Sequence, residues 1–121
     1  MKQIKKQYKH GLKFDSKLEL YFYELLKKHK FKFEFQVPYT LHPSFKYDGK
    51  TVRGMQLIVD FDFTKHGLNV IVDTKGYQRK DNILKWKFFK WLNVQAQPKI
   101  FFPKSTKECE QLVLLLKKLV N

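Results

Sequence analysis

The segment VIVDTKG, residues 70–76, ends an apolar strand with an acid and a lysine two positions apart. Residues two apart in a strand point to the same side of the sheet, so Asp73 and Lys75 share one face. By itself, such a pair is most often a surface ion pair that closes a strand. A catalytic interpretation requires a second acid opposite Asp73.

Asp60 is the predicted second acid, because the short turn KHG joins its strand to the strand of Asp73. A tight hairpin centred on His66–Gly67 places Asp60 across from Asp73 and Asp62 across from Ile71. Opposed β-carbons lie roughly 4.5–5.5 Å apart, and like charges at that distance destabilise a sheet unless something neutralises them. A divalent cation would do so. Asp62 is the alternative ligand, since a bulge would reverse the preference for Asp60.

Two carboxylates with the backbone carbonyl of Thr74 nearby suit a hard cation such as Mg²⁺, with Mn²⁺ as a substitute. A lysine beside a metal-bound water can orient the water, lower its pKa or offset charge on a phosphate under attack. Lys75 occupies that position. These are the demands of phosphodiester hydrolysis.

A third carboxylate is expected from the first helix. Ser16 and Glu19 form an S-x-x-E capping box, so the helix is predicted to begin at Ser16 and to end near Lys30. Glu19 borders the apolar stripe of Phe22 and Leu26, which aims it at the sheet. It would bind the metal directly or through a water. Capping alone also explains Glu19, and the two roles are compatible.

The remaining elements follow from periodicity and turn residues. Residues 31–37 alternate as a half-buried strand that Pro38 ends or places at an edge, and Asp48–Gly49 predicts a hairpin turn. Residues 56–63 form a strand with Leu57, Val59, Phe61 and Phe63 on one face. Asp81 caps a helix through about Leu92, whose core stripe is Leu84, Phe88 and Trp91 and whose Trp86 lies off that stripe. Pro98 to Phe102 forms a strand, and Ser105 with Glu108 caps a last helix that carries Cys109, Leu112, Val113, Leu116 and Leu119.

This order of helix, three strands, helix, strand and helix predicts an α/β fold, with a mixed sheet flanked by helices and a further C-terminal helix. The 121 residues are expected to form a single domain, in which residues 1–11 are a basic N-terminal arm. Cys109 cannot form an internal disulfide. The four histidines lack ligand spacing with it, which argues against structural zinc.

The charge is strongly positive, because 25 lysines and arginines face 11 acids for a formal net charge of +14. Such an excess attracts polyanions, and nucleic acid is the predicted partner. A membrane partner is not expected, because the chain carries no lipidation signal and no long apolar segment. We expect a cytoplasmic protein.

Three motifs together resemble the PD-(D/E)xK nuclease superfamily, which has the restriction-endonuclease-like fold. They are FDSKLELYFYELL with Glu19, IVDFDF with Asp60, and VIVDTKG with Asp73 and Lys75. The resemblance is nearest to small phage-encoded endonucleases and Holliday-junction-resolvase-like enzymes. It implies an αβββαβ core, Asp60 and Asp73 as metal ligands, Lys75 as the catalytic lysine and Glu19 as the helix acid. Val59 stands where the family usually has proline, and the acid before x-K is aspartate, the rarer choice.

Basic and polar residues around these motifs are the predicted DNA contacts. Lys80, Lys87 and Lys90 fall on one side of their helix and could follow a phosphate backbone; a solvated helix face is the alternative. The full set of predicted DNA-binding residues is Lys13, Gln78, Arg79, Lys80, Lys85 and Lys87.

The resemblance implies a Mg²⁺-dependent endonuclease that cuts DNA in recombination, replication or packaging, in the bacterial host cytoplasm if phage-encoded. No appended domain is available to read a long base sequence, so selectivity for DNA structure is expected. A homodimer would place two sites on two strands, and branched DNA suits that symmetry. The alternatives are a basic nucleic-acid-binding or phage accessory module that does not cut, and an RNA-directed nuclease.

Overall fold

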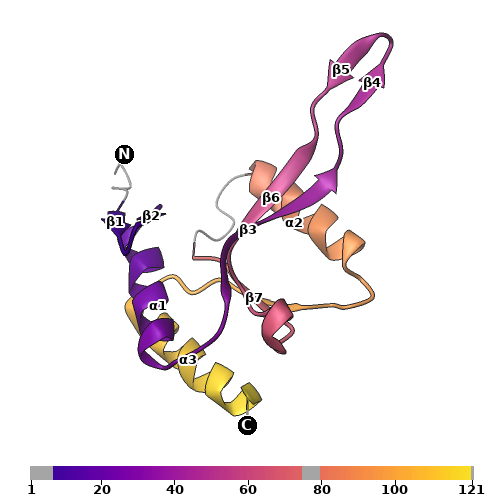
Figure 1. Ribbon diagram of the computed structural model, residues 1–121. Coiled ribbons are helices and arrows are strands. Elements are labelled where there is room, and N and C mark those ends of the chain that lie inside the picture. The colour runs from indigo at the N-terminus through magenta and orange to yellow at the C-terminus, as the bar shows by residue number, and fades with distance from the viewer. Residues whose placement is uncertain (1–6, 75–79, 121) are drawn as a thin grey trace.

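The computed structural model describes residues 7–74 and 80–120, and its elements are shown in Figure 1. A four-stranded sheet has the order β3-β6-β7-β8, in which β7 and β8 are parallel and the other pairs antiparallel. This confirms the predicted α/β fold with a mixed sheet, flanking helices and a C-terminal helix. The elements are β1 Gln7–Lys9, β2 Leu12–Phe14, α1 Lys17–Lys28, β3 Glu34–His42, β4 Phe45–Tyr47, β5 Lys50–Val52, β6 Met55–Asp62, a 3-10 turn Thr64–His66, β7 Val70–Val72, α2 Lys80–Leu92, β8 Lys99–Phe101 and α3 Thr106–Val120.

The helices divide the apolar residues into two cores. In the first core, α1 and α3 pack against Phe61, Phe63, Val70 and Val72 of the sheet region. In the second core, α2 packs against residues that include Leu57, Val59 and Ile71. The sheet is therefore covered on both sides, and β6 contributes to both cores. No helix in the described part of the chain is long and apolar enough to cross a membrane.

Both predicted capping boxes are present. The Ser16 hydroxyl accepts a hydrogen bond from the Glu19 N–H at 3.1 Å, and the Ser105 hydroxyl accepts one from the Glu108 N–H at 3.1 Å. The buried stripe of α3 contains Cys109, whose thiol pKa burial raises to about 12. Cys109 is thus an inert core residue. Leu119, the last of the apolar residues expected on this helix, is 44% exposed.

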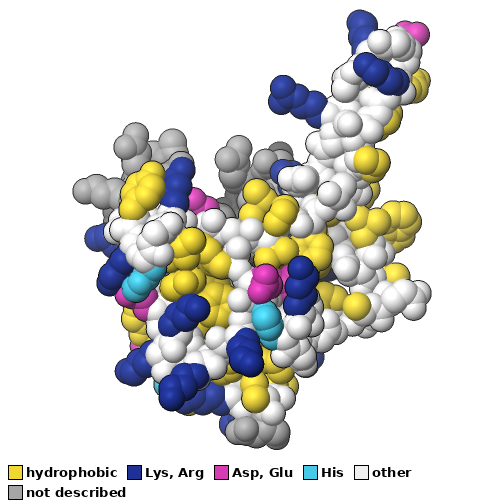
Figure 2. All heavy atoms as spheres, viewed as in Figure 1, with side chains coloured by type: hydrophobic (Ala, Val, Ile, Leu, Met, Phe, Trp, Pro, Cys, Tyr) yellow, Lys and Arg dark blue, Asp and Glu magenta, His cyan; other side chains and the backbone are white. Residues whose placement is uncertain are grey.

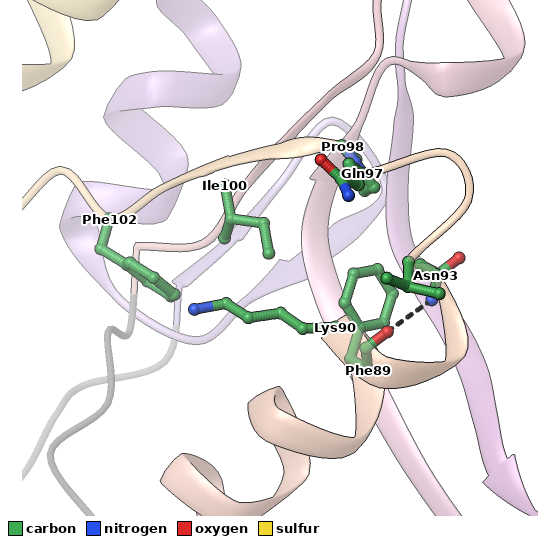
Figure 3. A pocket seen from close by; sticks show the side chains of 8 residues that line it. Phe89, Lys90, Asn93, Gln97, Pro98, Ile100 and Phe102 are labelled. Carbon is green, nitrogen blue, oxygen red and sulfur yellow. Dashed lines mark hydrogen bonds between the residues drawn. The ribbon is translucent and has the colours of Figure 1, made fainter.

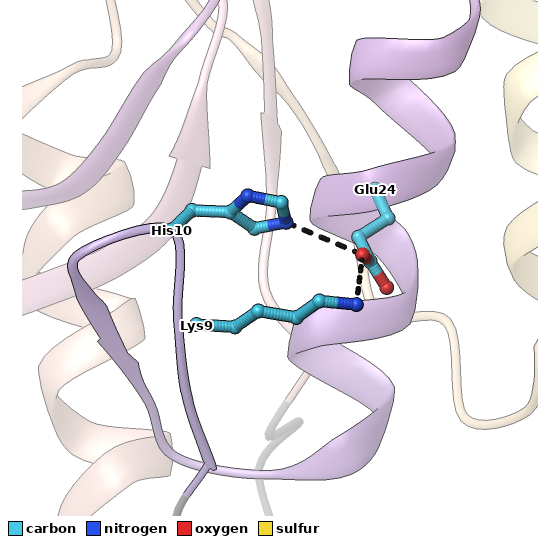
Figure 4. A network of polar contacts seen from close by, with 3 residues as sticks. All are labelled: Lys9, His10 and Glu24. Atoms are coloured by element: carbon cyan, nitrogen blue, oxygen red, sulfur yellow. Dashed lines mark hydrogen bonds and ion pairs between the residues drawn. The ribbon is translucent and has the colours of Figure 1, made fainter.

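The N-terminal segment forms a hairpin from residue 7 onward, where the sequence predicts an arm through residue 11. His10 and Gly11 adopt left-handed φ values of 58° and 72° and join β1 to β2. Lys9 and His10 bind the Glu24 carboxylate of α1 at 2.8 and 3.2 Å (Figure 4), and these contacts lower the pKa of Glu24. The hairpin is thereby tied to the helix that carries Glu19.

Strand β3 continues beyond the proline that was expected to end or edge it. Pro38 lies inside β3 and pairs with Ile58, and β3 is an edge strand of the sheet. An edge strand tolerates proline because the missing N–H would face away from the ladder. The edge interpretation is confirmed, and the predicted end at Pro38 is wrong. The strand also begins later than predicted, at Glu34.

Side chains two residues apart on β3, and likewise on β6, do not all enter the same core. Phe35 packs into the core of α1 and α3, whereas Val37 packs into the core of α2. Gln36 lies between them with a left-handed φ of 53°, which departs from the extended backbone that gives strict alternation. On β6, the same change of core occurs between Val59 and Phe61.

The predicted common face of β6 is therefore wrong. Leu57 and Val59 belong to the core of α2, and Phe61 and Phe63 belong to the core of α1 and α3. The residue at the change is Asp60, which lies between the two groups. A period-two pattern cannot reveal this change, because all four positions are apolar and buried in either case.

Helix α2 buries a different face from the predicted one. Trp86 and Phe89 are 2% and 1% exposed, whereas Leu84, Phe88 and Trp91 are 50%, 39% and 71% exposed. Large apolar residues surround this helix on all sides, so helical spacing alone does not select the buried stripe. The helix begins at Lys80, which puts Asp81 in its first turn and not at the predicted cap.

The predicted Asp48–Gly49 turn joins β4 to β5 in a hairpin that projects away from the two cores (Figures 1 and 2). Both turn residues are left-handed, with φ values of 51° and 74°. This is the backbone pattern of the two-residue type I′ turn, whose twist matches that of paired strands.

The corrected face of α2 gives a direct test with two tryptophans on one helix. Replacing Trp86 with alanine should lower the free energy of unfolding by about 3–5 kcal/mol, because Trp86 packs on Phe89 and Phe102 in the core. Trp91→Ala should change it by less than about 0.5 kcal/mol at concentrations where the protein is monomeric, because Trp91 is exposed. Urea unfolding followed by circular dichroism measures both values, and similar losses in the two variants would contradict this packing.

Candidate functional site

Two acids from the start of α1 meet one acid from the sheet. Asp15 precedes the cap of α1, Glu19 lies in the first turn of α1, and Asp60 lies on β6. Each offers a carboxylate oxygen, and these oxygens lie within 4.8 Å of one another. Glu19 and Asp60 are fully buried, whereas Asp15 is half-buried. The structure thus brings together two predicted site residues, Glu19 and Asp60, and adds Asp15.

Glu19 is oriented by backbone and side-chain donors. Its Oε1 accepts a hydrogen bond from the Asp15 N–H at 2.9 Å and one from the Gln36 side-chain amide at 3.3 Å. The Gln36 amide also donates to the Lys13 carbonyl at 3.0 Å. The left-handed Gln36 therefore connects β2, β3 and the helix acid. A non-glycine residue in this conformation stores strain, which is common near functional sites.

Gln36 and Asp15 were not among the site residues predicted from the sequence. Asp15 carries a usable signal, because it stands one helical turn before Glu19 and directly before the capping serine. Gln36 carries none, because glutamine has no preference for a left-handed backbone. Its role depends on the pairing of β3 with β6, which sets Gln36 at the level of Asp60 between the paired residues Phe35–Phe61 and Val37–Val59.

Asp60 is bound to the end of the β7 segment. Thr74 donates its backbone N–H and its hydroxyl to Asp60 Oδ2, both at 2.8 Å. Thr74 is the residue whose carbonyl oxygen the sequence predicts as a metal ligand, and it stands between Asp73 and Lys75. The D-T-K segment is therefore attached to Asp60 through its central residue.

The predicted hairpin register is confirmed in the β6–β7 ladder, where Phe61 pairs with Val72 and Asp62 pairs with Ile71. Asp73 follows directly after β7, and its N–H donates to the Phe101 carbonyl at 3.0 Å. Asp60 and Asp73 are the next residues after the pair Phe61–Val72, so the predicted pairing of Asp60 with Asp73 lies one residue beyond the end of the ladder.

Asp73 is 4% exposed and lines a cavity of about 210 Å³ together with Asn82, Lys85 and Trp86. Within the described ranges 7–74 and 80–120, the three-acid group of Asp15, Glu19 and Asp60 does not include Asp73. The role of Asp73 as a metal ligand stays a prediction. Lys75, Gln78 and Arg79 lie outside the described residues.

Asp62, the alternative ligand, has a structural task. Its Oδ1 accepts hydrogen bonds from the Thr64 N–H at 2.8 Å and from the Thr64 hydroxyl at 2.6 Å, and its Oδ2 accepts one from the Tyr39 hydroxyl. Burial, together with the bond to Asp62, raises the pKa of Tyr39 to about 12. Both oxygens of Asp62 therefore fix the turn after β6. The irregularity between β3 and β6 lies at Thr40–His42, near the other end of β6.

The predicted DNA-binding lysines are spread around this site. Lys13 on β2 is exposed, and its carbonyl is bonded to Gln36. Lys85 is half-buried beside Asp73, whereas Lys87 is exposed on α2. Lys80 is the first residue of α2.

A larger cavity, about 520 Å³, lies elsewhere, between the end of α2 and β8 (Figure 3). Phe89, Ile100 and Phe102 line it, and the Lys90 side chain extends toward Phe102. None of the three clustered acids lines this cavity, so volume alone does not locate the candidate chemistry.

Because Gln36 has a left-handed backbone, we expect a glycine variant at this position to be more stable than an alanine variant. Gln36→Gly and Gln36→Ala both remove the side-chain amide, but only glycine adopts a positive φ without strain. The glycine variant should therefore be more stable by about 1 kcal/mol in urea unfolding. Thr40, whose φ is not positive, provides the control: there the alanine variant should be the more stable one. The same order at both positions would contradict the strained backbone.

Comparison with known proteins gives one match. A family model described as "Protein of unknown function (DUF1064)" matches residues 2–108. No curated protein and no solved structure matches the chain. Because the family model covers most of the 121 residues, the chain belongs to the DUF1064 family.

Proposed function

We propose that the protein is a Mg²⁺-dependent endonuclease that hydrolyses DNA phosphodiester bonds. The observation that carries this proposal is the convergence of Glu19 from α1 with Asp60 from β6, while Thr74 attaches the D-T-K segment to Asp60. A helix acid, a strand acid and a following D-x-K segment are the parts that the resemblance to PD-(D/E)xK nucleases implies. The net charge of +14 supports a polyanionic substrate.

The donor set fits a hard divalent cation. Three carboxylates with oxygens within 4.8 Å of one another, two of them fully buried, would repel each other when ionised. Oxygen-only donors of this kind favour Mg²⁺ or Mn²⁺ over zinc. Asp60 and Glu19 would hold the cation, with Asp15 as a further donor. When bound, the cation would supply a water of lowered pKa and neutralise charge on the phosphate.

The residues of the chain have separable roles in this proposal. Gln36 and the Asp15 N–H fix Glu19, and Thr74 fixes Asp60, so the acids are oriented before substrate arrives. Lys75, which follows Thr74, would stabilise the negative charge that develops on the phosphate. The attacking water oxygen forms a bond to phosphorus, the bond from phosphorus to the leaving sugar oxygen breaks, and a proton ends on that oxygen.

A non-cutting nucleic-acid-binding module is the second candidate, and one observation favours it. Asp73 lines the cavity on the α2 side and is outside the three-acid group. A site without its D-x-K acid would bind DNA without hydrolysing it. For the enzyme, the proposed setting is phage recombination, replication or packaging in the host cytoplasm.

Cleavage assays with two aspartate variants separate these functions. Asp60→Asn should lower the rate of DNA cleavage by about 100-fold or more, since it removes a charge that acts on the reacting centre. Asp62→Asn is the matched control and should keep the rate within a few fold, because Asp62 bonds Thr64 and Tyr39. Removing the metal with EDTA should abolish cleavage, and adding Mg²⁺ or Mn²⁺ should restore it.

The substrates should be labelled duplex, single strand, flap and four-way junction, with an RNA duplex beside them. Preference for the junction or flap would support selectivity for DNA structure. Cleavage without metal, or an active Asp60→Asn variant, would exclude the proposed mechanism. Binding without cleavage of every substrate would favour the module.

We also propose that the protein is a homodimer, because two symmetric sites match two strands. The exposed stripe of Leu84, Phe88 and Trp91 on α2 supports this proposal, since large exposed apolar patches mark interaction surfaces. Trp91→Lys should convert a dimer into a monomer in analytical ultracentrifugation. Leu114→Lys, at an exposed leucine of α3, is the control and should leave the mass unchanged. A monomeric wild-type protein, or equal effects of both changes, would contradict this interface.

A further inference from the structure

The β4–β5 hairpin extends from the body as a separate arm. Figure 2 shows it standing clear of the cores, with dark blue basic side chains along it, and every residue from 43 to 54 is exposed. None of its side chains belongs to either apolar core. The arm therefore adds little to the stability of the fold.

The two faces of the arm differ in chemistry. Phe45 pairs with Val52 and Tyr47 pairs with Lys50, so these four side chains share one face. Lys46 pairs with Thr51 on the other face, where its ammonium donates to the threonine hydroxyl. Tyr47 is 72% exposed and Phe45 is 47% exposed. Lys50 thus lies opposite Tyr47 on the aromatic face, whereas Lys46 lies on the other face.

The arm carries a net positive charge. Lys46, Lys50 and Arg53 face a single acid, Asp48, at the turn. A two-stranded hairpin without a packed face is marginally stable in water, and exposed aromatic rings add an unfavourable term. A partner that is negatively charged and accepts stacked or apolar side chains would offset both.

We propose that the β4–β5 hairpin is a DNA-binding arm that enters the major groove of a duplex. The groove of B-form DNA, about 12 Å wide, admits a two-stranded β-ribbon, and its walls carry the phosphates that the three cations would contact. A-form RNA has a deep and narrow major groove that excludes such a ribbon. The geometry therefore favours duplex DNA over duplex RNA.

Strand β6 connects the arm to Asp60, one of the three clustered acids. β6 leaves the hairpin at Met55 and reaches Asp60 five residues later, a distance of about 17 Å along an extended strand. One turn of DNA spans about 34 Å, so a duplex held by the arm would pass the acids within the same turn. Figure 1 shows the arm projecting at the upper right from the ends of β3 and β6, whereas α1 lies at the left. This inference goes beyond the proposed function, because binding by the arm requires no cleavage.

A charge-matched comparison tests the arm. The arm variant carries Lys46→Ala, Lys50→Ala and Arg53→Ala, and the control variant carries Lys104→Ala, Lys107→Ala and Lys118→Ala at exposed positions of the opposite chain end. Both lose three positive charges. Binding of a labelled 20-base-pair DNA duplex is measured by fluorescence anisotropy in EDTA, at several salt concentrations, with an RNA duplex of the same sequence beside it.

The arm variant should bind DNA about tenfold or more weakly than wild type at low salt, and the slope of log affinity against log salt should become shallower by about 2 to 3, since each phosphate contact contributes about 0.9. The control should stay within about threefold, with a slope change below about 1. A double variant, Phe45→Ala with Tyr47→Ala, should also weaken DNA binding. RNA binding should change equally in the arm and control variants. Melting temperatures of all variants should match wild type within a few degrees.

Equal weakening of DNA binding by the arm and control variants would overturn the proposal, because overall charge would then explain the effect. Unchanged DNA binding combined with a loss of dimer in the aromatic variant would also overturn it and make the arm a contact between copies. Absence of DNA binding by the wild type would overturn it as well. The EDTA conditions exclude cleavage, so inactive protein in the cleavage assay leaves this test unaffected.

Discussion

Two fully buried carboxyl groups, Glu19 on α1 and Asp60 on β6, lie side by side at the point where helix and sheet meet. Ionised groups at this distance and away from water repel each other strongly. The surrounding structure supplies hydrogen-bond donors to both: the Asp15 N–H and the Gln36 amide for Glu19, and two groups of Thr74 for Asp60. The hydrogen-bond donors to the two acids therefore come from three different segments.

Holding these donors in place accounts for the irregular centre of the sheet. Gln36 reaches Glu19 from a left-handed backbone, and at the same level the side chains of β3 and β6 change from one core to the other. If both strands were regular, all side chains on one face of β6 would pack into the same core. Asp62, two residues after Asp60, accepts hydrogen bonds from Thr64 and Tyr39 at the end of β6. The two acids of IVDFDF thus have different tasks within three residues.

Several large apolar side chains are exposed on the surface of this basic protein. Trp91 and Phe88 on α2 and Tyr47 on the β4–β5 hairpin are exposed, although each could have been polar without loss of packing. Their burial by partners would recover free energy that the isolated chain does not gain. A protein that closes on DNA with a second copy would use one such surface for each contact.

The sequence by itself determined the element order from α1 onward, both capping boxes, the Asp48–Gly49 turn and the β6–β7 register, because each depends on contacts between residues close along the chain. It also selected Glu19 and Asp60 as candidate site residues, and the structure places both in one cluster of acids. It did not predict the β1–β2 hairpin. The buried face of α2, the left-handed Gln36, the change of cores at Asp60 and the outward direction of the β4–β5 hairpin were decided only by tertiary structure. Each of these depends on which of several equally apolar or equally polar side chains meets a distant segment, and local periodicity carries no information about that choice.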